Sequence, residues 1–450
     1  MTARSGIRTP GKPGNLCPEP AANVREYMSI IDRLSDEASW REFREYKSRK
    51  SLMSNKEIEA LDRFIDEKGY LRVTGRITPD ECGFSYPKKM VINKRGTRKK
   101  RTVYSYSDDE NYVLKMMVWL LYRYDEKISP ACYSFRRNMT AAGAMASILS
   151  IRNISRMYSI KLDIHDYFNS IPPDKLMEVT REFIDDDPRL IAFLDDLMTA
   201  DKAYDSQTGE LIEGRRGAMA GVPLSAFFAD IYLESLDRIF TEAGIPYYRY
   251  SDDMIAFAER QEDIERYRRI IEDHITEKGL ELNPDKEVVT GPGESWEFLG
   301  FKYDRGRIDL SDVTVRKMKD RIRRKAHALY RWRIKKSAGF RHTAKVMIRV
   351  FNTKFYDNEG WDEFTWSRWF FPVITQDKGL RELDEYLLQY IRYLYSGRHY
   401  KGNYRVSYDQ IKALGFRSLV HEYWLYKGRD AVTDENAEEK TEAAPEAAAE

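Results

Sequence analysis

Residues 247–258 read Tyr-Tyr-Arg-Tyr-Ser-Asp-Asp-Met-Ile-Ala-Phe-Ala, and this stretch constrains the fold most strongly. Two short runs of aromatic and apolar residues flank a Ser-Asp turn, which is the pattern of a β-hairpin. The hairpin brings Asp252 and Asp253 side by side at its tip. Adjacent carboxylates repel each other, and neither gains much from folding unless a cation neutralises them. The stretch therefore predicts a cation-binding hairpin.

The same three letters recur at Ser107-Asp108-Asp109, in a different context. There they precede Glu110 and an apolar helical pattern. At a helix N-terminus, acidic side chains cap free amides and interact favourably with the helix dipole. We therefore expect residues 107–109 to be structural and residues 251–253 to bind a cation.

A third carboxylate, Asp163, ends the strand-like run Tyr158-Ser-Ile-Lys-Leu162. Taken alone, it would be read as a turn residue at the end of a strand. Hard cations such as Mg²⁺ take oxygen ligands, and phosphoryl transfer often uses two metal ions about 3.5–4 Å apart. A carboxylate on a strand beside the hairpin would complete such a site. We therefore predict Asp163, Asp252 and Asp253 as the metal-binding and catalytic residues.

Five segments in order resemble sequence motifs A to E of prokaryotic reverse transcriptases, the group that includes group II intron, retron and defence-associated enzymes. The resemblance covers roughly residues 80–340 and is greatest to free-standing, defence-associated enzymes of the "unknown group". The segments are Asp163 with Phe168 (motif A), Gly221-Val-Pro-Leu-Ser225 (B), Tyr250-Ser-Asp-Asp253 (C), Gly279-Leu-Glu-Leu-Asn-Pro-Asp-Lys286 (D) and Trp296-Glu-Phe-Leu-Gly-Phe301 (E).

The resemblance implies an α+β fold of the right-hand polymerase type, with fingers, a palm built on an antiparallel sheet, a helical thumb and a helical C-terminal extension. The expected divisions are a disordered N-terminus (1–24), a helical N-terminal extension (25–80), fingers (81–160), palm (161–303, with a fingers segment within about 174–215), a basic thumb with its extension (304–428) and an acidic disordered tail (429–450).

The implied activity is that of an RNA-directed DNA polymerase, which adds dNTPs to a primer 3′-OH with two Mg²⁺ ions, Mn²⁺ being able to substitute. Lys286 would then lie near the leaving pyrophosphate as a fourth catalytic residue. Expected partners are an RNA template, most simply a dedicated non-coding RNA, with a DNA primer and product. The expected setting is bacterial anti-phage defence.

Phe168 follows Asp163 by five residues, where the resembled family places an aromatic ring beneath the incoming sugar. Such a ring clashes with a ribose 2′-OH and so selects dNTPs. The alternative is a core phenylalanine beside Tyr167. Motif B departs from the family pattern, because Ala220 precedes the glycine where a glutamine is usual. The predicted substrate-binding residues are Lys94, Lys100, Arg101, Phe168, Gly221 and Tyr250.

Two basic segments suggest contacts with nucleic acid. Residues 88–101 hold eight Lys/Arg and no acid, and residues 301–350 hold 17 Lys/Arg against four Asp. Both could be solvated charged surfaces. The resemblance implies that residues 88–101 form a fingers hairpin that contacts the triphosphate. It also implies that residues 301–350 include a thumb helix that lies along the duplex backbone. The predicted nucleic-acid contacts are Arg136 and Arg137, in Ser134-Phe-Arg-Arg137, and Arg321, Arg324 and Lys325.

Composition limits the remaining possibilities. Among 450 residues, 75 Lys/Arg balance 73 Asp/Glu, so net charge alone indicates no partner. The three cysteines fit reduced thiols rather than disulfides or a zinc site. There is no apolar run of membrane-spanning length and no signal-peptide core, so we expect a cytoplasmic protein without membrane contact. We find no His/Asn-rich nuclease cassette and no RNase H-like acidic cluster.

Two other functions remain open. The same palm could serve a template-independent or protein-primed DNA polymerase, although 30 tyrosines offer too many candidate primers to choose one. A degenerate palm could instead be a catalytically weak RNA-binding scaffold, and the complete set of Asp163, Asp252 and Asp253 argues against that. Primer, template and oligomeric state do not follow from the sequence.

Overall fold

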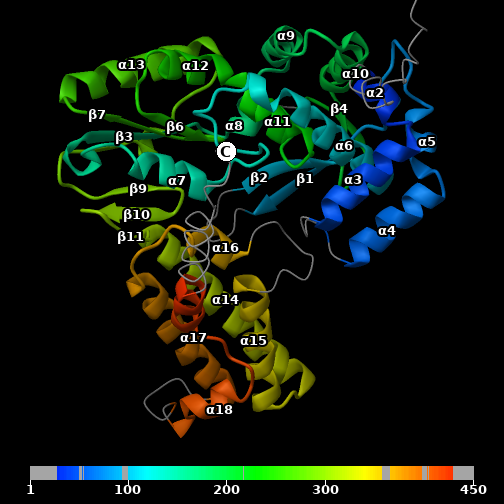
Figure 1. Ribbon diagram of the computed structural model, residues 1–450. Helices are drawn as coiled ribbons and strands as arrows, with labels where there is room; N and C mark the ends of the chain where they lie inside the picture. The colour runs from blue at the N-terminus through cyan, green and yellow to red at the C-terminus, as the bar shows by residue number, and fades with distance from the viewer. Residues whose placement is uncertain are drawn as a thin grey trace, which may run out of the picture.

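The computed structural model describes residues 28–49, 53, 55–93, 100–215, 217–356, 365–397, 403 and 405–428. The structure has an upper part built of helices and sheets and a lower part that is a bundle of helices (Figure 1). The predicted α+β class with antiparallel sheets is confirmed. The predicted disordered ends, and the middle of the basic segment 88–101 with Lys94, lie outside the described residues.

The central sheet is antiparallel, in the strand order β6-β7-β3-β8. The hairpin predicted around Ser251 is confirmed as β6 and β7, and the strand before Asp163 as β3. Side chains of β7 alternate between two cores, Met254 and Ala256 in one and Ile255 and Phe257 in the other. The strands are β3 (Tyr158–Asp163), β6 (Tyr247–Tyr250), β7 (Asp253–Ala258) and β8 (Val288–Thr290).

Helices cover the upper face of this sheet, while α7 and a small sheet lie below it (Figure 1). The chain from Leu224 to Glu242 forms two helices rather than one, because the backbone at Leu233 leaves helical geometry (φ −108°, ψ 12°). The elements are α11 (Leu224–Tyr232), α12 (Glu234–Glu242), α13 (Gln261–Glu277), η2 (Ile154–Arg156), η3 (Pro284–Lys286) and α7 (Ala141–Leu149).

A second sheet, in the order β2-β1-β4-β5, joins two distant parts of the chain. Strand β1 pairs antiparallel with β2 and parallel with β4, so Lys88 lies opposite both Ser105 and Tyr204. The segment after β3 thus returns to the sheet that the earlier hairpin began. The elements are β1 (Lys88–Asn93), β2 (Lys100–Ser105), α8 (Tyr167–Ser170), α9 (Pro173–Phe183), α10 (Pro188–Thr199), β4 (Lys202–Asp205) and β5 (Leu211–Glu213).

The N-terminal helices pack on α6, whose start confirms the structural interpretation of residues 107–109. Ser107 accepts a hydrogen bond from the Glu110 amide, and the Glu110 carboxylate accepts one from the Ser107 amide, a capping box. Within residues 28–49 the chain forms two separate helices, α2 and α3. The helices are α2 (Ile30–Arg33), α3 (Glu37–Arg49), α4 (Asn55–Asp66), α5 (Gly69–Thr74), α6 (Asp108–Leu121) and η1 (Tyr122–Lys127).

The lower part joins a three-stranded sheet to a helical bundle in which α17 packs between α14 and α15. Its buried side chains include Trp366, Phe370 and Tyr423, so much of the aromatic content expected of a C-terminal extension is core. The elements are β9 (Trp296–Phe298), β10 (Phe301–Asp304), β11 (Arg307–Leu310), α14 (Asp312–Lys336), α15 (Phe340–Phe355), α16 (Trp366–Phe370), α17 (Lys378–Ser396) and α18 (Tyr408–Lys412).

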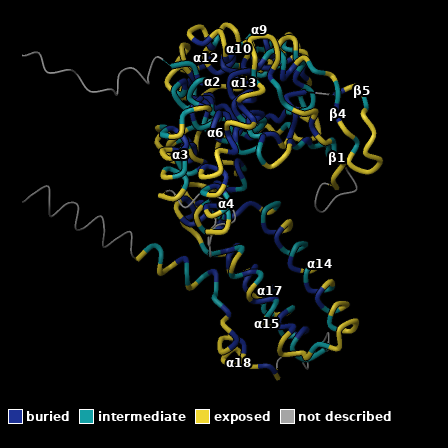
Figure 2. The backbone as a smooth tube through the Cα atoms, turned by 90° about the vertical axis from the view of Figure 1, so that its right-hand side faces the viewer, coloured by how far each residue is buried: buried dark blue, intermediate teal, exposed yellow. Residues whose placement is uncertain are grey.

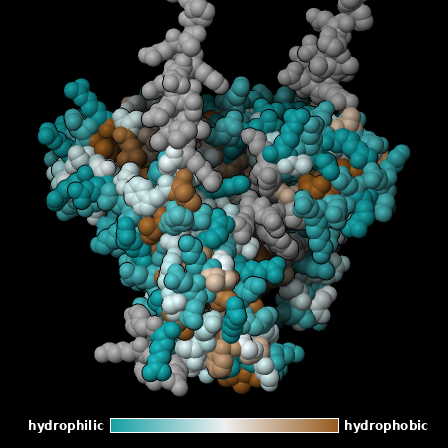
Figure 3. Space-filling model, turned by 60° about the horizontal axis from the view of Figure 1, so that its bottom comes forward, coloured by the Kyte–Doolittle hydropathy of each residue, from teal (hydrophilic) through white to brown (hydrophobic). Residues whose placement is uncertain are grey.

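Burial follows this division, with buried positions lining the inside of both parts and exposed positions outside (Figure 2). Seen with the bundle end brought forward, the surface is mostly hydrophilic, with small hydrophobic patches among the polar residues (Figure 3). Among the described helices, none combines the length and the apolar character that crossing a membrane requires.

Candidate active site

Strand pairing brings the three predicted carboxylates to one edge of the central sheet. Asp163 and Asp253 are directly paired across β3 and β7, and Asp252 stands in the turn before Asp253. Ser251 begins that turn with a left-handed backbone (φ 59°), which a short polar residue tolerates better than a bulky one. The Asp252 carbonyl accepts a hydrogen bond from the Ile164 amide at 3.3 Å, which ties the turn to the end of β3.

This arrangement concentrates negative charge where water is scarce. Asp163 is only 3% exposed, and Asp252 and Asp253 are half-buried. Burial, followed by repulsion from Asp253 and Asp163, raises the pKa of Asp252 to about 6. Burial also raises the pKa of Asp253, although the Lys161 ammonium 3.8 Å away opposes the shift. Repulsion among these partly buried carboxylates destabilises the folded protein, and a bound cation would reduce that repulsion.

Lys286 partly meets that need in the present structure. Its ammonium lies 2.5 Å from Oδ2 of Asp163. Asn283 holds the same residue, since its amide donates to the Asp163 carbonyl at 2.7 Å and its side chain to Oδ1 at 3.4 Å. Lys286 therefore serves here as the counterion of a predicted metal ligand rather than as a group set apart for pyrophosphate.

The donor set suits a hard divalent cation, although its side chains are spread rather than gathered. Among the described side chains, no three His, Cys, Asp or Glu residues are grouped closely enough to hold a metal ion. Carboxylate oxygens are the ligands that Mg²⁺ prefers, and burial together with mutual repulsion already raises the pKa of Asp252. The residues therefore fit the ion chemically, on condition that Lys286 gives up Asp163.

These carboxylates face a cleft of about 900 Å³ between the central sheet and the start of α14. Phe168 lines this cleft while the rest of its ring packs against the core, so it combines both roles considered for it. The Arg101 guanidinium lies 5.8 Å from the centre of that ring. The residues that line the cleft include Ser159, Lys161, Asp163, Phe168, Tyr250, Ser251, Asp252, Asp253 and Lys286.

Two glycines fix the floor around Phe168. A Cβ on Gly217 would lie 2.2 Å from the Phe168 carbonyl, which instead accepts the Ala218 amide at 2.8 Å. Gly221 (φ 100°) lies against β2, because a Cβ there would be 2.9 Å from the Tyr104 carbonyl. Gly221 was predicted as a nucleotide contact. The structure places it between palm and fingers, outside the residues that line the cleft.

The basic residues predicted to contact nucleic acid or nucleotide differ in how far their side chains are available for binding. Arg136 donates to the carbonyls of Asp125, Ser129 and Cys132 at 2.6–3.0 Å, so its terminal nitrogens shape a loop rather than face a template. Arg137 is exposed, with its guanidinium 5.0 Å from the Tyr122 ring. Lys100 is exposed on β2, next to Arg101.

The predicted thumb residues lie on α14 beyond the cleft. Lys317, which we did not predict, lines the cleft itself, and its charge weakly opposes the rise that burial causes in the pKa of Asp253. Arg321, Arg324 and Lys325 follow it at helical spacings of three and four, so they continue the same face of α14 away from the carboxylates. In Figure 2 this helix stands on the same side of the molecule as strands β1, β4 and β5.

A buried ion pair beneath the hairpin was also not predicted. Arg249 and Asp237 are both fully buried, with Nη2 and Oδ2 2.5 Å apart. Arg249 also donates to the carbonyls of Ala229, Asp230 and Ser251. Its position in an aromatic strand pattern gave no sign of this role, because the partner lies twelve residues earlier on another element.

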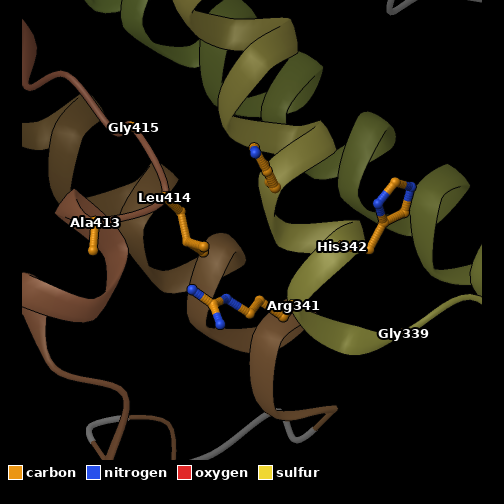
Figure 4. A pocket seen from close by; sticks show the side chains of 7 residues that line it. Gly339, Arg341, His342, Ala413, Leu414 and Gly415 are labelled. Atoms are coloured by element: carbon orange, nitrogen blue, oxygen red, sulfur yellow. The ribbon is translucent and has the colours of Figure 1, made fainter.

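A second hollow, of about 770 Å³, lies at the far end of the bundle. Arg341, at the start of α15, points across it toward Leu414, whereas the His342 side chain points away (Figure 4). Since no carboxylate lines it, this hollow lacks the chemistry of the cleft. It is lined by Gly339, Arg341, His342, Lys345, Ala413, Leu414 and Gly415.

Residues 92–303 match the family model of reverse transcriptases, described as RNA-dependent DNA polymerases. The match begins at the end of β1, includes β2 and the paired carboxylates, and ends within β10. With the sheets described above, this match confirms the predicted right-hand polymerase fold over this part of the chain. No curated protein matches the chain significantly.

Solved structures of telomerases resemble the chain distantly. One is apo telomerase from Candida tropicalis, truncated from its C-terminal domain, with 14% identity, a TM-score of 0.40, and coverage of 51% of this chain and 55% of that one. Another is telomerase from Candida albicans in complex with a fragment of telomeric RNA, with 15% identity, a TM-score of 0.37, and coverage of 73% and 63%. The chain thus spans less than two thirds of either.

The charge stored at the hairpin yields a stability prediction. Asp252→Asn should stabilise the metal-free protein at pH 7 by about 1–2 kcal/mol, because the amide removes a carboxylate whose pKa is raised in the folded state. The gain should shrink as the pH falls through about 6, where Asp252 itself takes up a proton. Denaturant unfolding in EDTA at several pH values would measure it.

The second Ser-Asp-Asp sequence supplies the matched control. Asp108→Asn removes a charge from the N-terminus of α6, so it should destabilise the protein, by up to about 1 kcal/mol. Shifts of the same sign for the two substitutions would contradict the different roles assigned to these identical triplets.

Proposed function

We propose that this protein extends a primer 3′-OH with dNTPs on an RNA template, since residues 92–303 match the family model of reverse transcriptases. The pairing of Asp163 with Asp253, beside Asp252 and above an open cleft, is the observation that carries this proposal. Two Mg²⁺ ions held by these carboxylates would activate the attacking hydroxyl and stabilise the leaving pyrophosphate.

The chain's own residues complete the proposed reaction. When the carboxylates bind metal, Lys286 is released from Asp163 and its ammonium can approach the departing pyrophosphate. Arg101, above the ring of Phe168, is placed to bind the triphosphate from the fingers side. Phe168 lies under the incoming sugar, where its ring excludes a 2′-OH. Tyr250 borders the same cleft beside the carboxylates.

The wider biological role is also a proposal. We infer a dedicated non-coding RNA as template and a function in bacterial anti-phage defence in the cytoplasm, on the resemblance to free-standing, defence-associated enzymes. Sequencing the nucleic acid that copurifies with the protein tests this inference. One recurrent RNA with complementary DNA would support it, whereas DNA joined covalently to the protein would favour protein priming.

The carboxylates yield the first prediction of activity. Asp252→Asn with Asp253→Asn should abolish dNTP incorporation while the protein still melts cooperatively, because two of three metal anchors are lost. Asp108→Asn with Asp109→Asn is the matched control and should retain activity. Primer extension with purified proteins measures both, and polymerisation by the well-folded first variant would refute the metal assignment.

The thumb helix yields the second prediction. Replacing Arg321, Arg324 and Lys325 with alanine should weaken binding of a primer-template duplex and flatten its salt dependence. Each phosphate contact contributes roughly 0.9 to the slope of log K against log salt for a B-form duplex, so up to about three units should be lost. Filter binding at several salt concentrations measures the slope.

The matched control for the thumb changes three cations on the other side of the central sheet, at the start of α13. Arg260, Arg266 and Arg269 are exposed there. Their replacement with alanine should leave the slope unchanged. Equal slopes for both triple variants would mean that α14 does not track the duplex.

The sugar-binding position yields the third prediction. Phe168→Val or Phe168→Ala should admit ribonucleotides with a modest loss of dNTP activity, because the smaller side chain leaves room for one oxygen. Comparing kcat/KM for dGTP and GTP decides between this role and a purely structural one. A structural role predicts equal loss with both nucleotides and destabilisation by about 3–5 kcal/mol for the alanine variant.

A further inference from the structure

Phe135 has a conformation and an exposure that packing does not explain. Its backbone is left-handed (φ 50°), which is rare for a bulky residue and signals strain. Its ring is 41% exposed, so the strain is not repaid by burial. Strain of this kind persists only where the surroundings impose it, and it clusters at functional sites.

The residues on either side impose this conformation. Ser134, fully buried, accepts a hydrogen bond from the Ser251 amide at 2.9 Å and donates one to the Asp230 carboxylate at 2.5 Å. Arg136 is fastened to carbonyls of its own loop, as described above. The loop is thus anchored to the turn that carries the catalytic carboxylates, and Phe135 projects from it into the cleft.

In the cleft, Phe135 belongs to a row of aromatic rings. Its centroid lies 6.5 Å from that of Phe168, in an edge-to-face arrangement, and 6.2 Å from that of Tyr250. Tyr250 in turn lies 5.6 Å from Trp369 of the bundle. The row runs from the floor of the cleft to the thumb, and all four rings line the cleft.

We propose that Phe135 is a positioning residue for sugar discrimination, and that its ring braces the ring of Phe168 against rotation. This inference rests on the proposed role of Phe168. Rejecting a nucleotide that differs by one oxygen requires that the excluding side chain keep its position. A shift of about 1 Å at an active site can change rates by about a hundredfold. Tyr167, Arg101 and Phe135 are described neighbours of the Phe168 ring, and of these three Phe135 alone lines the cleft.

The test compares kcat/KM for dGTP and GTP in wild type, Phe135→Ala, Phe168→Ala and the double variant. Phe135→Ala should reduce discrimination against GTP by about tenfold or more, mainly through faster GTP incorporation. In the Phe168→Ala background it should change the ratio no further, because its effect passes through that ring. Phe135→Tyr keeps the ring and should keep the discrimination.

A matched control lies far from the cleft. Tyr408 is 44% exposed and makes a similar edge-to-face contact with Phe416, at 6.2 Å. Tyr408→Ala should leave the nucleotide ratio unchanged. For a variant with little turnover, the shifts in melting temperature produced by dGTP and by GTP give the same comparison through binding.

The outcomes separate this inference from the proposed function. The inference is wrong if Phe135→Ala lowers kcat/KM equally for dGTP and GTP. It is also wrong if Phe135→Ala changes the ratio of the two kcat/KM values as much in the Phe168→Ala background as in the wild type. The first result would make Phe135 a general contact for nucleic acid. An unchanged ratio for Phe168→Ala, with activity retained, would instead refute the sugar-excluding role and the inference with it. If Phe135→Ala reduces discrimination against GTP only when Phe168 is present, the result supports both the sugar-excluding role of Phe168 and the positioning role of Phe135.

Discussion

The register between β3 and β7 is the constraint on which the rest of the site depends. Because side chains alternate along a strand, a slip of one residue would turn Asp163 toward the opposite face from Asp253. Alternate residues of β7 enter two different cores, which makes such a slip costly on both faces of the sheet. The packing that stabilises the fold therefore also brings the carboxylates together.

That juxtaposition has an energetic cost, and the protein offsets it with its own cations. Lys286 pairs with Asp163, Lys161 approaches Asp253, and Lys317 adds to the field from α14. The ion pair of Arg249 and Asp237 also holds the hairpin in place, and both of its side chains are fully buried. Removing one partner of such a pair leaves an uncompensated buried charge, so the hairpin is strongly held in place.

Local patterns were predicted well from the sequence, because their causes are local. The hairpin, the strand before Asp163 and the capping box at Ser107 each follow from a few neighbouring residues. The break at Leu233 and the buried role of Arg249 were missed, since tertiary packing decides both. Arg136 shows the same limit in another form: a sequence shows that a donor exists, and only the fold shows that loop carbonyls occupy it.

The parallel pairing of β1 with β4 has a consequence for synthesis of the chain. The fingers hairpin emerges from the ribosome about a hundred residues before the strand that completes its sheet. Throughout that interval one edge of β1 lacks its partner, and an open edge is a template for pairing with other chains. Strand β1 begins with an exposed Lys88 and a half-buried Lys89, and none of its residues is buried. Charged side chains of this kind disfavour pairing of the open edge with other chains during that interval.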